Sequence, residues 1–234
     1  MTGAVPSVIA IDGPAASGKG TIAQGVAQAL GFHYLDSGSL YRLVALQALE
    51  SGIPLGDEER LAAAAEALAS AFVGERILLS GSDVTAAIRA PAVSAAASQV
   101  AVHPGVRRAL LARQRAFCRP PGLVADGRDM GTVVFPDARL KVFVTASAEE
   151  RARRRYKQLI EKGNPVILSS LLRDIQERDA RDGGRTAAPL RAAADAVILD
   201  TTGMSIADSI GFVLQRYRAL EAGGGAIVAS RQQE

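Results

Sequence analysis

The stretch from Val8 to Thr21 constrains the fold more than any other part of the chain. Four strand-like residues, Val8–Ile11, run into a loop bounded by Gly13 and Gly18, and an alanine-rich amphipathic segment follows. Lys19 comes directly after the second glycine. Glycines let the backbone turn tightly, so that successive N–H groups point inward at phosphate oxygens. A helix N-terminus adds partial positive charge. The stretch therefore predicts a strand, a phosphate-binding loop and a helix in that order.

The loop departs from the strict pattern at one position. Gly20 stands where a Ser or Thr would normally bind Mg²⁺ or a phosphate, and the hydroxyl comes one residue later, as Thr21. This Gly-Lys-Gly-Thr order resembles that of nucleoside monophosphate kinases. A chance glycine-rich loop is the alternative, but spacing, lysine, hydroxyl and flanking elements agree. We expect the following residues to bind ATP, with Thr21 on Mg²⁺ directly or through water: Gly13, Pro14, Ala15, Ala16, Ser17, Gly18, Lys19, Gly20 and Thr21.

Composition excludes several other classes of protein. The chain has 234 residues, of which 48% are hydrophobic, enough for a globular core of one or two domains. Its 27 basic residues nearly balance 24 acidic ones, so its charge does not favour a nucleic-acid partner. A single cysteine, Cys118, permits no intrachain disulfide and fits a reducing compartment; we expect an incidental half-buried thiol. No signal peptide and no apolar run of ~20 residues is visible. We expect a cytoplasmic monomer that contacts neither membrane nor nucleic acid.

The order of elements predicts a parallel α/β sheet. A helix is expected over Lys19–Leu30, a short strand over Phe32–Leu35 and a helix from Ser39 to about Ser51. Strand-helix-strand order with short connections is typical of parallel sheets. In such sheets ligands bind at the carboxyl ends of the strands, where the phosphate loop lies.

The pattern of predicted secondary structure changes from Pro54 to about Phe117. The pattern predicts an alanine-rich helix over Leu61–Phe72, a strand over Arg76–Leu79, an extended piece over Asp83–Ile88, and helices over Pro91–Val102 and Val106–Phe117. Short antiparallel strands differ from a parallel core, so this part is expected to be an inserted subdomain. The core then resumes with strands over Leu123–Asp126, Leu140–Thr145 and Ala196–Leu199, and helices over Ser147–Gly163, Leu171–Asp182 and Ser205–Leu220. We expect Gly223 to open a flexible tail.

Arginines recur just past several strands and helices, at Arg42, Arg128, Arg178, Arg181 and Arg185. Phosphoryl transfer requires two negatively charged phosphate groups to be held in line with each other. Cations around them must neutralise their charge. The chain lacks the Asn-Lys-x-Asp pattern of GTPases, which favours a small-molecule kinase.

Other interpretations of these charged residues stay open. The arginines at 151–155 suit a solvated helix face, above all Arg151 and Arg153, with Arg154 or Arg155 turned toward nucleotide. Arg178 and Arg181 could pair along their own helix. Asp126 suits either a Mg²⁺-water ligand or a strand-end helix cap.

The chain resembles the bacterial cytidylate kinases over about Val8 to Leu220. The resemblance is carried by Ile11–Pro14 with Gly18–Thr21, Tyr34–Arg42, Ala97–Ala101, Asp126–Pro136, and Arg178–Asp182 with Arg185 and Ala188–Leu190. The Asp126–Pro136 block is specific, whereas the phosphate loop alone is not. Ala16, where many relatives have glycine, and Gly183-Gly184 are departures from the family pattern.

The resemblance implies transfer of the ATP γ-phosphoryl group to CMP or dCMP, with Mg²⁺ as cofactor. It implies a phosphate-loop nucleoside monophosphate kinase fold with a CORE (1–53, 118–150 and 186–222), an NMP-binding subdomain with an insertion (54–117), a short LID region (151–185) and a tail (223–234).

Carried over position by position, the resemblance also implies the binding residues. Ser37, Arg42, Arg128 and Arg185 would surround the CMP phosphate; Ser98, Arg107 and Asp129 would read cytosine; Arg178 and Asp182 would lie near the sugar. The catalytic set would be Lys19, Arg128, Arg178 and Arg185. The rivals are a phosphate-loop kinase with another small acceptor and a nucleotide-dependent switch without transfer activity.

Overall fold

The computed structural model describes residues 6–161 and 163–229. Its elements in chain order are β1 (Ser7–Asp12), α1 (Lys19–Leu30), β2 (His33–Asp36), α2 (Ser37–Glu50), α3 (Glu58–Glu66), β3 (Ser70–Val73), β4 (Arg76–Leu79), β5 (Ser82–Asp83), η1 (Ala87–Arg89), α4 (Pro91–Val100), α5 (Pro104–Arg115), β6 (Gly122–Gly127), η2 (Met130–Val134), β7 (Leu140–Thr145), α6 (Ala148–Glu161), α7 (Leu168–Gly183), β8 (Val197–Asp200) and α8 (Ile206–Ala229).

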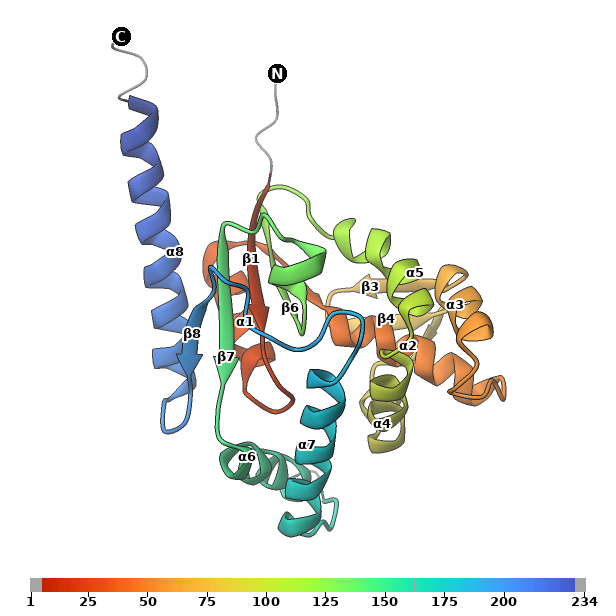
Figure 1. Ribbon diagram of the computed structural model, residues 1–234. Coiled ribbons are helices and arrows are strands. Elements are labelled where there is room, and N and C mark those ends of the chain that lie inside the picture. Colours follow the sequence, from red (N-terminus) through yellow and green to blue (C-terminus); the bar gives the residue numbers. More distant parts are fainter. Residues whose placement is uncertain (1–5, 162, 230–234) are drawn as a thin grey trace.

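The core is a five-stranded sheet in the order β2-β6-β1-β7-β8, and every neighbouring pair is parallel. β1 lies at the centre, and its last residue, Asp12, is the register partner of Gly127 at the end of β6. The carboxyl ends of the strands point toward the lower side of Figure 1, where the loop after β1 turns back into α1. The predicted parallel α/β sheet is confirmed.

Alternation along β1 gives the sheet two apolar faces. Ile9 and Ile11 are buried with α1 and α8, whereas Val8 and Ala10 are buried with α2 and the helices that follow it. Successive side chains of a strand point to opposite sides. A strand that is covered on both sides therefore reads as a continuous apolar run, as Val8–Ile11 does.

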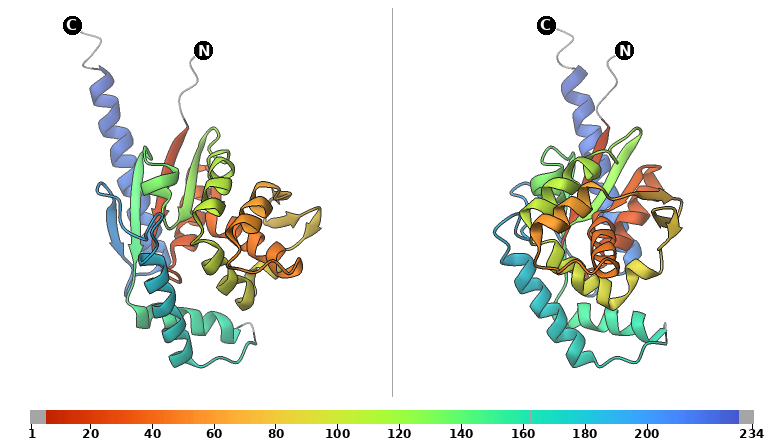
Figure 2. Two further views of the ribbon diagram at one scale, coloured as in Figure 1. Left: turned by 45° about the vertical axis from the view of Figure 1, so that its right-hand side comes forward. Right: turned by 90° about the vertical axis from the view of Figure 1, so that its right-hand side faces the viewer.

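The segment after Pro54 carries a second, antiparallel sheet in the order β3-β4-β5. It does not have a core of its own: Leu61, Leu79 and Leu110 belong to the same buried cluster as Leu40 of α2 and Leu123 of β6. Figure 2 shows this part beside the main sheet, with α4 facing the α6–α7 hairpin.

The predicted helix over Leu61–Phe72 is wrong in its second half. α3 begins at the Asp57 cap and ends at Glu66, and Ser70–Val73 form strand β3. The alanine run has high helix propensity, but pairing of Phe72 with Ile77 across the Gly74 turn overrides it. Of the predicted extended piece Asp83–Ile88, only Asp83 lies in a strand, β5.

The closing helix is longer than predicted. α8 continues past the expected end at Leu220, through the glycines, to Ala229. The predicted tail at 223–234 is therefore helical up to Ala229, and residues 230–234 lie outside the described residues. The helix continues there although glycine costs about 1 kcal/mol in a helix interior. None of the described helices combines the length and apolar composition needed to cross a bilayer.

A substitution at Gly122, the first residue of β6, can test how tightly the sheet is packed against its surroundings. A Cβ added to Gly122 would lie 2.6 Å from ring atoms of Phe32, which itself packs edge-to-face on Tyr217. We predict that Gly122→Ala lowers the free energy of unfolding by about 1–3 kcal/mol, because a ring cannot yield as a flexible chain can. Urea denaturation measures it. Gly56→Ala, where an added Cβ meets nothing within 4 Å, is the matched control. Equal stabilities of the two variants would contradict the packing described.

Candidate active site

The phosphate loop has the backbone geometry that its glycines require. Gly13 has a φ of 154°, and a Cβ there would lie 2.0 Å from the Val144 carbonyl oxygen. Gly18, in the left-handed region, forms the N-cap of α1. Ala16 also has a positive φ, 59°, in the region that favours glycine. The departure from the family pattern at Ala16 thus falls on a strained residue.

Lys19 lies under the loop and not in solvent. It is 8% exposed, and its Nζ donates to the Pro14 carbonyl oxygen at 3.1 Å. Burial first, and then repulsion by Arg128, lower its pKa to about 7, against the opposing attraction of Asp126. A phosphate oxyanion at the loop would therefore restore the charged form of this lysine.

Arginines of α6 hold the loop from behind. Arg151 donates to the Ala15 carbonyl oxygen at 3.3 Å and pairs with Asp179 of α7 at 2.6 Å. Arg154 donates to the Ser17 carbonyl oxygen at 3.3 Å. The expectation that Arg151 lies on a solvated face is wrong, because it is buried against the loop. Arg153, 68% exposed, is solvated as predicted.

The structure around position 20 explains why a glycine stands there. A Cβ there would lie 3.1 Å from Asp126 Oδ2 and 3.7 Å from Tyr34 Oη. Tyr34 Oη donates to the same carboxylate oxygen at 2.9 Å, which keeps it in place. The buried carboxylate of Asp126 thus occupies the space that a Ser or Thr side chain would need. Thr21 is exposed on the first turn of α1.

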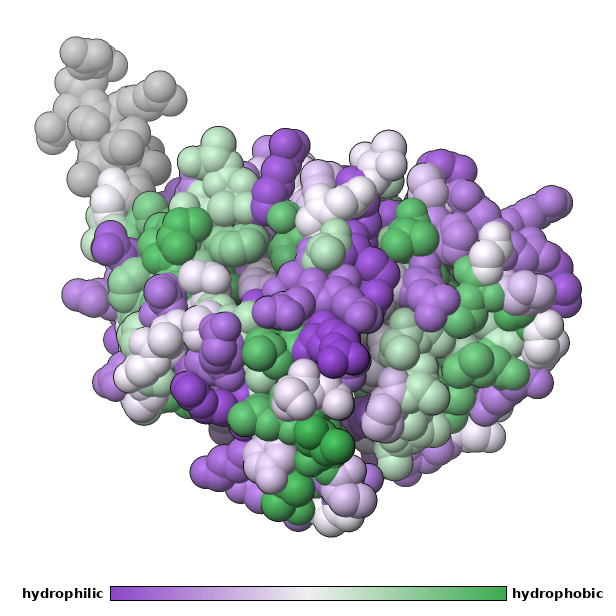
Figure 3. All heavy atoms as spheres, turned by 60° about the horizontal axis from the view of Figure 1, so that its bottom comes forward, coloured by the Kyte–Doolittle hydropathy of each residue, from purple (hydrophilic) through white to green (hydrophobic). Residues whose placement is uncertain are grey.

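A cleft of about 1630 Å³ opens in front of the loop. It is larger than the ~300–1,000 Å³ typical of a site for one small ligand, so there is room for two. Viewed toward the carboxyl ends of the strands, hydrophilic side chains gather across the middle of this face, with hydrophobic ones on both sides (Figure 3).

Most of the predicted site residues line this cleft. They are Ala15, Ala16, Gly18, Lys19, Gly20, Thr21, Ser37, Arg42, Ser98, Arg107, Arg128, Asp129, Arg178 and Arg185. The predicted residues that lie behind the lining are Gly13, Pro14, Ser17 and Asp182. Asp182 is fully buried behind the lining, and its place near the sugar stays a prediction.

Asp182 is the counterion of three arginines. Its carboxylate accepts from Arg128 Nε at 2.9 Å and from Arg185, and it lies 4.0 Å from Arg178 Nε. Burial alone would raise the pKa of Asp182, but Arg128, Arg185 and Arg178 outweigh it and lower the pKa below its ordinary value. Arg178 has its own pKa lowered to about 10, by burial and then by repulsion from Arg128.

Two of these arginines have a buried donor without a partner. The Nε atoms of Arg178 and Arg185 are buried, and neither has a hydrogen-bond partner among the residues that the structure describes. A buried donor without an acceptor is costly. Both residues line the cleft, so their guanidinium groups suit a phosphate group there.

The inner end of the cleft is built from three segments. Asp129, 3% exposed, accepts from Arg107 of α5, whose guanidinium lies 5.7 Å from the centre of the Tyr41 ring. Ser98 of α4 contributes a buried Oγ that has no hydrogen-bond partner in the described part of the chain. A carboxylate, a guanidinium and a free hydroxyl can together read the edge of a planar heterocycle.

Sequence reasoning missed several residues that line the cleft. Among them are Tyr34, Asp36, Arg89 and Lys157. Arg154 and Arg155, one of which is predicted to turn toward nucleotide, both line the cleft. Asp36 caps α2 through Ser39 and accepts from Arg42 at 3.2 Å. The Asp-Ser-Gly-Ser turn carried a signal for this cap. The remaining side chains come from helix faces that only the folded arrangement defines.

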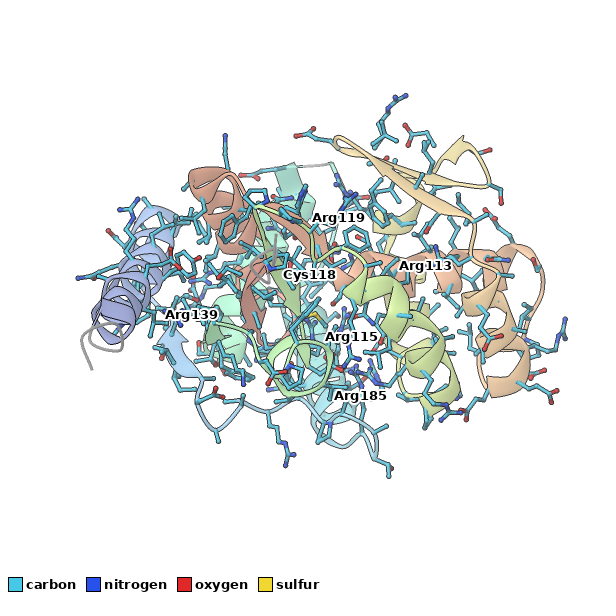
Figure 4. The ribbon with its side chains drawn as sticks, turned by 90° about the horizontal axis from the view of Figure 1, so that it is seen from above. Arg113, Arg115, Cys118, Arg119, Arg139 and Arg185 are labelled. Atoms are coloured by element: carbon cyan, nitrogen blue, oxygen red, sulfur yellow. The ribbon has the colours of Figure 1, made fainter. Side chains whose placement is uncertain are left out.

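The single cysteine lies away from the cleft lining. Burial raises the pKa of the Cys118 thiol, which is half-buried as predicted. Figure 4 shows Cys118 on the connection between α5 and β6, apart from Arg185, which follows α7. Among the described residues, no group of three or more His, Cys, Asp or Glu could hold a metal ion.

A parallel sheet, a phosphate loop at its central strand and an arginine-lined cleft with room for a second ligand define a phosphate-loop kinase of the nucleoside monophosphate kinase class. The family model for cytidylate kinase matches residues 9–219. A cytidylate kinase of Bordetella bronchiseptica is 58% identical over 93% of this chain and 97% of that protein. One of Cupriavidus necator is 57% identical over 92% and 97%. The chain belongs to the cytidylate kinase family.

Solved structures also include similar chains. A gluconokinase from Sinorhizobium meliloti 1021 aligns with a TM-score of 0.49 and 17% identity over 98% of this chain and 99% of that chain.

The buried carboxylate of Asp182 yields a prediction about stability. We predict that Asp182→Asn lowers the free energy of unfolding at pH 7 by about 3 kcal/mol, because the buried arginines lose their counterion. The pKa of Asp182 is lowered below the ordinary 3.8, so its contribution is complete above that pH and is lost as the pH falls through the folded-state pKa.

Urea denaturation from pH 7 to pH 2 checks this prediction. The difference in the free energy of unfolding between wild type and variant should become smaller below pH 3.8. Asp195→Asn is the control, since Asp195 pairs with Lys141 at an exposed position. A deficit that stayed constant down to pH 2 would show that the charge of Asp182 is not the cause.

Proposed function

We propose that this protein catalyses transfer of the γ-phosphoryl group of ATP to CMP and dCMP, giving ADP and CDP or dCDP. Family membership supports the reaction class. The observation that favours a cytosine nucleotide is the buried Arg107–Asp129 pair, which lines the same cleft as Ser98 with its unpaired Oγ.

The acceptor base is selected by complementary donors and acceptors. Cytosine carries an exocyclic amine that can donate to the Asp129 carboxylate, as cytosine amines do to carboxylates elsewhere. Arg107 and the Ser98 hydroxyl can donate to ring N3 and the O2 carbonyl. Uracil presents a carbonyl where cytosine has the amine, so it would leave Asp129 unpaired in a buried site.

The two phosphate groups are held by two neighbouring sets of residues in the cleft. Lys19 and the amides of the phosphate loop hold the β- and γ-phosphates of ATP. Arg42, Arg128 and Arg185 hold the acceptor phosphate, with Ser37 beside them, and Arg178 and Asp182 lie toward the sugar. We assign residues 54–117 to the acceptor-binding part and 151–185 to the lid.

The chemical step then needs little from the protein beyond position and charge. An acceptor phosphate oxygen, already an anion at neutral pH, attacks the γ-phosphorus. The bond from that phosphorus to the bridging oxygen breaks, and its electron pair stays on the β-phosphate of ADP. No general base is required, and Lys19 with the arginines stabilises the charge of the transition state.

The oxygen donors near Gly20 fit Mg²⁺, which prefers hard ligands and keeps several waters. Thr21 would hold the ion through its hydroxyl, and Asp126 through water. When bound, the ion supplies charge neutralisation between the β- and γ-phosphates.

The substrate assignment predicts the outcome of a side-by-side assay. With ATP and Mg²⁺, ADP release should depend on added CMP or dCMP, and UMP, AMP and shikimate should support far less turnover. A coupled assay with each acceptor, and with none, measures this. ATP hydrolysis independent of any acceptor would favour a nucleotide switch, and preference for another acceptor would favour a different small-molecule kinase.

The base-reading assignment predicts an asymmetric loss of affinity. Asp129→Ala should weaken CMP binding by about 10- to 100-fold, because the cytosine amine and Arg107 both lose a buried acceptor. ATP binding should change little. Calorimetric titration with each nucleotide alone measures the two affinities. Asp137→Ala, an exposed aspartate on the same connection, is the matched control. Equal losses for both nucleotides would contradict the assignment.

A further inference from the structure

Asp12, the last residue of β1, is a buried carboxylate that the proposed mechanism does not use. It is 5% exposed and lies outside the described lining of the cleft. Its two oxygens accept hydrogen bonds from the backbone N–H groups of Met130 and Gly131, both at 2.8 Å. These contacts join the strand before the phosphate loop to a turn well over a hundred residues later.

The contacted groups are the first amides of η2, the short turn that follows Asp129. The first amides of a helical turn have no partner within it, and a carboxylate there is favourable. An aspartate at the N-cap, here Asp129, ordinarily supplies that carboxylate itself. In the described structure Asp129 makes no such side-chain bond to η2. Its carboxylate is paired with Arg107 at the inner end of the cleft instead.

We propose that Asp12 is a positioning residue for the acceptor side of the site: by capping η2 from β1, it leaves the Asp129 side chain free to face the acceptor base. The inference rests on the proposed function for its substrate, but the positioning contact itself does not. Because Arg128 immediately precedes Asp129, the same contact fixes the direction of the backbone from which that guanidinium reaches Asp182.

The surroundings of Asp12 make this contact sensitive to protonation. Burial raises the pKa of Asp12 to about 7, and Asp129 and Asp126 add to the rise, while the bonds from Gly131 and Met130 oppose it. The adjoining elements also carry Lys19, whose Nζ is directed to Pro14, and Lys141, whose Nζ pairs with Asp195. Three arginines are nearby as well: Arg128 pairs with Asp182, Arg107 pairs with Asp129, and Arg115 donates to the Val134 carbonyl oxygen of η2. A protonated Asp12 would lose one of its two acceptor positions for η2.

Asp12→Asn tests the inference, since an amide keeps one acceptor but turns a donor toward a donor. At pH 8 the variant should bind CMP at least about tenfold more weakly than wild type, while its affinity for ATP changes less than about threefold. Tyr217→Phe is the matched control, because it removes the 3.0 Å bond to Ser7 Oγ at the opposite end of the same strand. Calorimetric titration with each nucleotide alone measures the affinities.

Equal weakening of CMP and ATP, or unchanged CMP affinity in a folded variant, overturns the inference. If Asp12→Asn does not fold, the wild-type protein without ligand provides the readout. The amide resonances of Met130 and Gly131 should move together between pH 9 and pH 5, and their hydrogen exchange should speed up at the acidic end after correction for intrinsic rates. Amides that do not respond overturn the positioning role. A wild-type protein that binds no CMP overturns the proposed function instead, and the amide titration still decides the role of Asp12.

Discussion

A dense group of cations has to be stable in this cleft before the phosphate groups that it would bind arrive. Lys19, Arg128, Arg178 and Arg185 repel one another, and burial makes each charge more costly. The chain meets this constraint with carboxylates placed behind the cations. Asp182 is fully buried and lies beside three arginines that line the cleft, Arg128, Arg178 and Arg185. Removing such a carboxylate would therefore disturb folding and binding together.

The strand, loop and helix at the start of the chain could be predicted from the sequence, because their signals are local. Glycine spacing, the lysine and the apolar run before them predicted α1 with its observed bounds. Signals that depend on distant partners were weaker. The arginine-rich pattern of α6 could not show that Arg151 is buried, since its partner Asp179 lies on another helix. The alanine-rich segment likewise did not show that the residues after it form β3. Helix propensity is a local property and does not depend on Ile77, which pairs with Phe72 in the neighbouring strand.

The acceptor end could be predicted as a set of residues but not as a geometry. Ser98, Arg107 and Asp129 come from α4, α5 and the turn after β6, and the resemblance to a family brought them together. What joins them physically is one shared apolar cluster, in which Leu110 of α5 packs with Leu123 of β6. The inserted segment is thus not a separate domain in its packing. The role of Asp12 could not be predicted from the sequence, because its side chain accepts hydrogen bonds from backbone N–H groups, and a pattern of side chains does not indicate such contacts.

The register of β1 and β6 has a consequence for the alignment of the two reactants. Asp12 is paired with Gly127, so the phosphate loop and Arg128 leave the sheet side by side, about 4.8 Å apart. A slip by one residue would shift one edge by about 3.3 Å and turn its side chains to the other face. The coarse offset between donor and acceptor walls is therefore a property of a backbone ladder in the most buried part of the molecule. Substitutions of residues that line the cleft can therefore change its specificity while the alignment of the two reactants, which the backbone sets, stays the same.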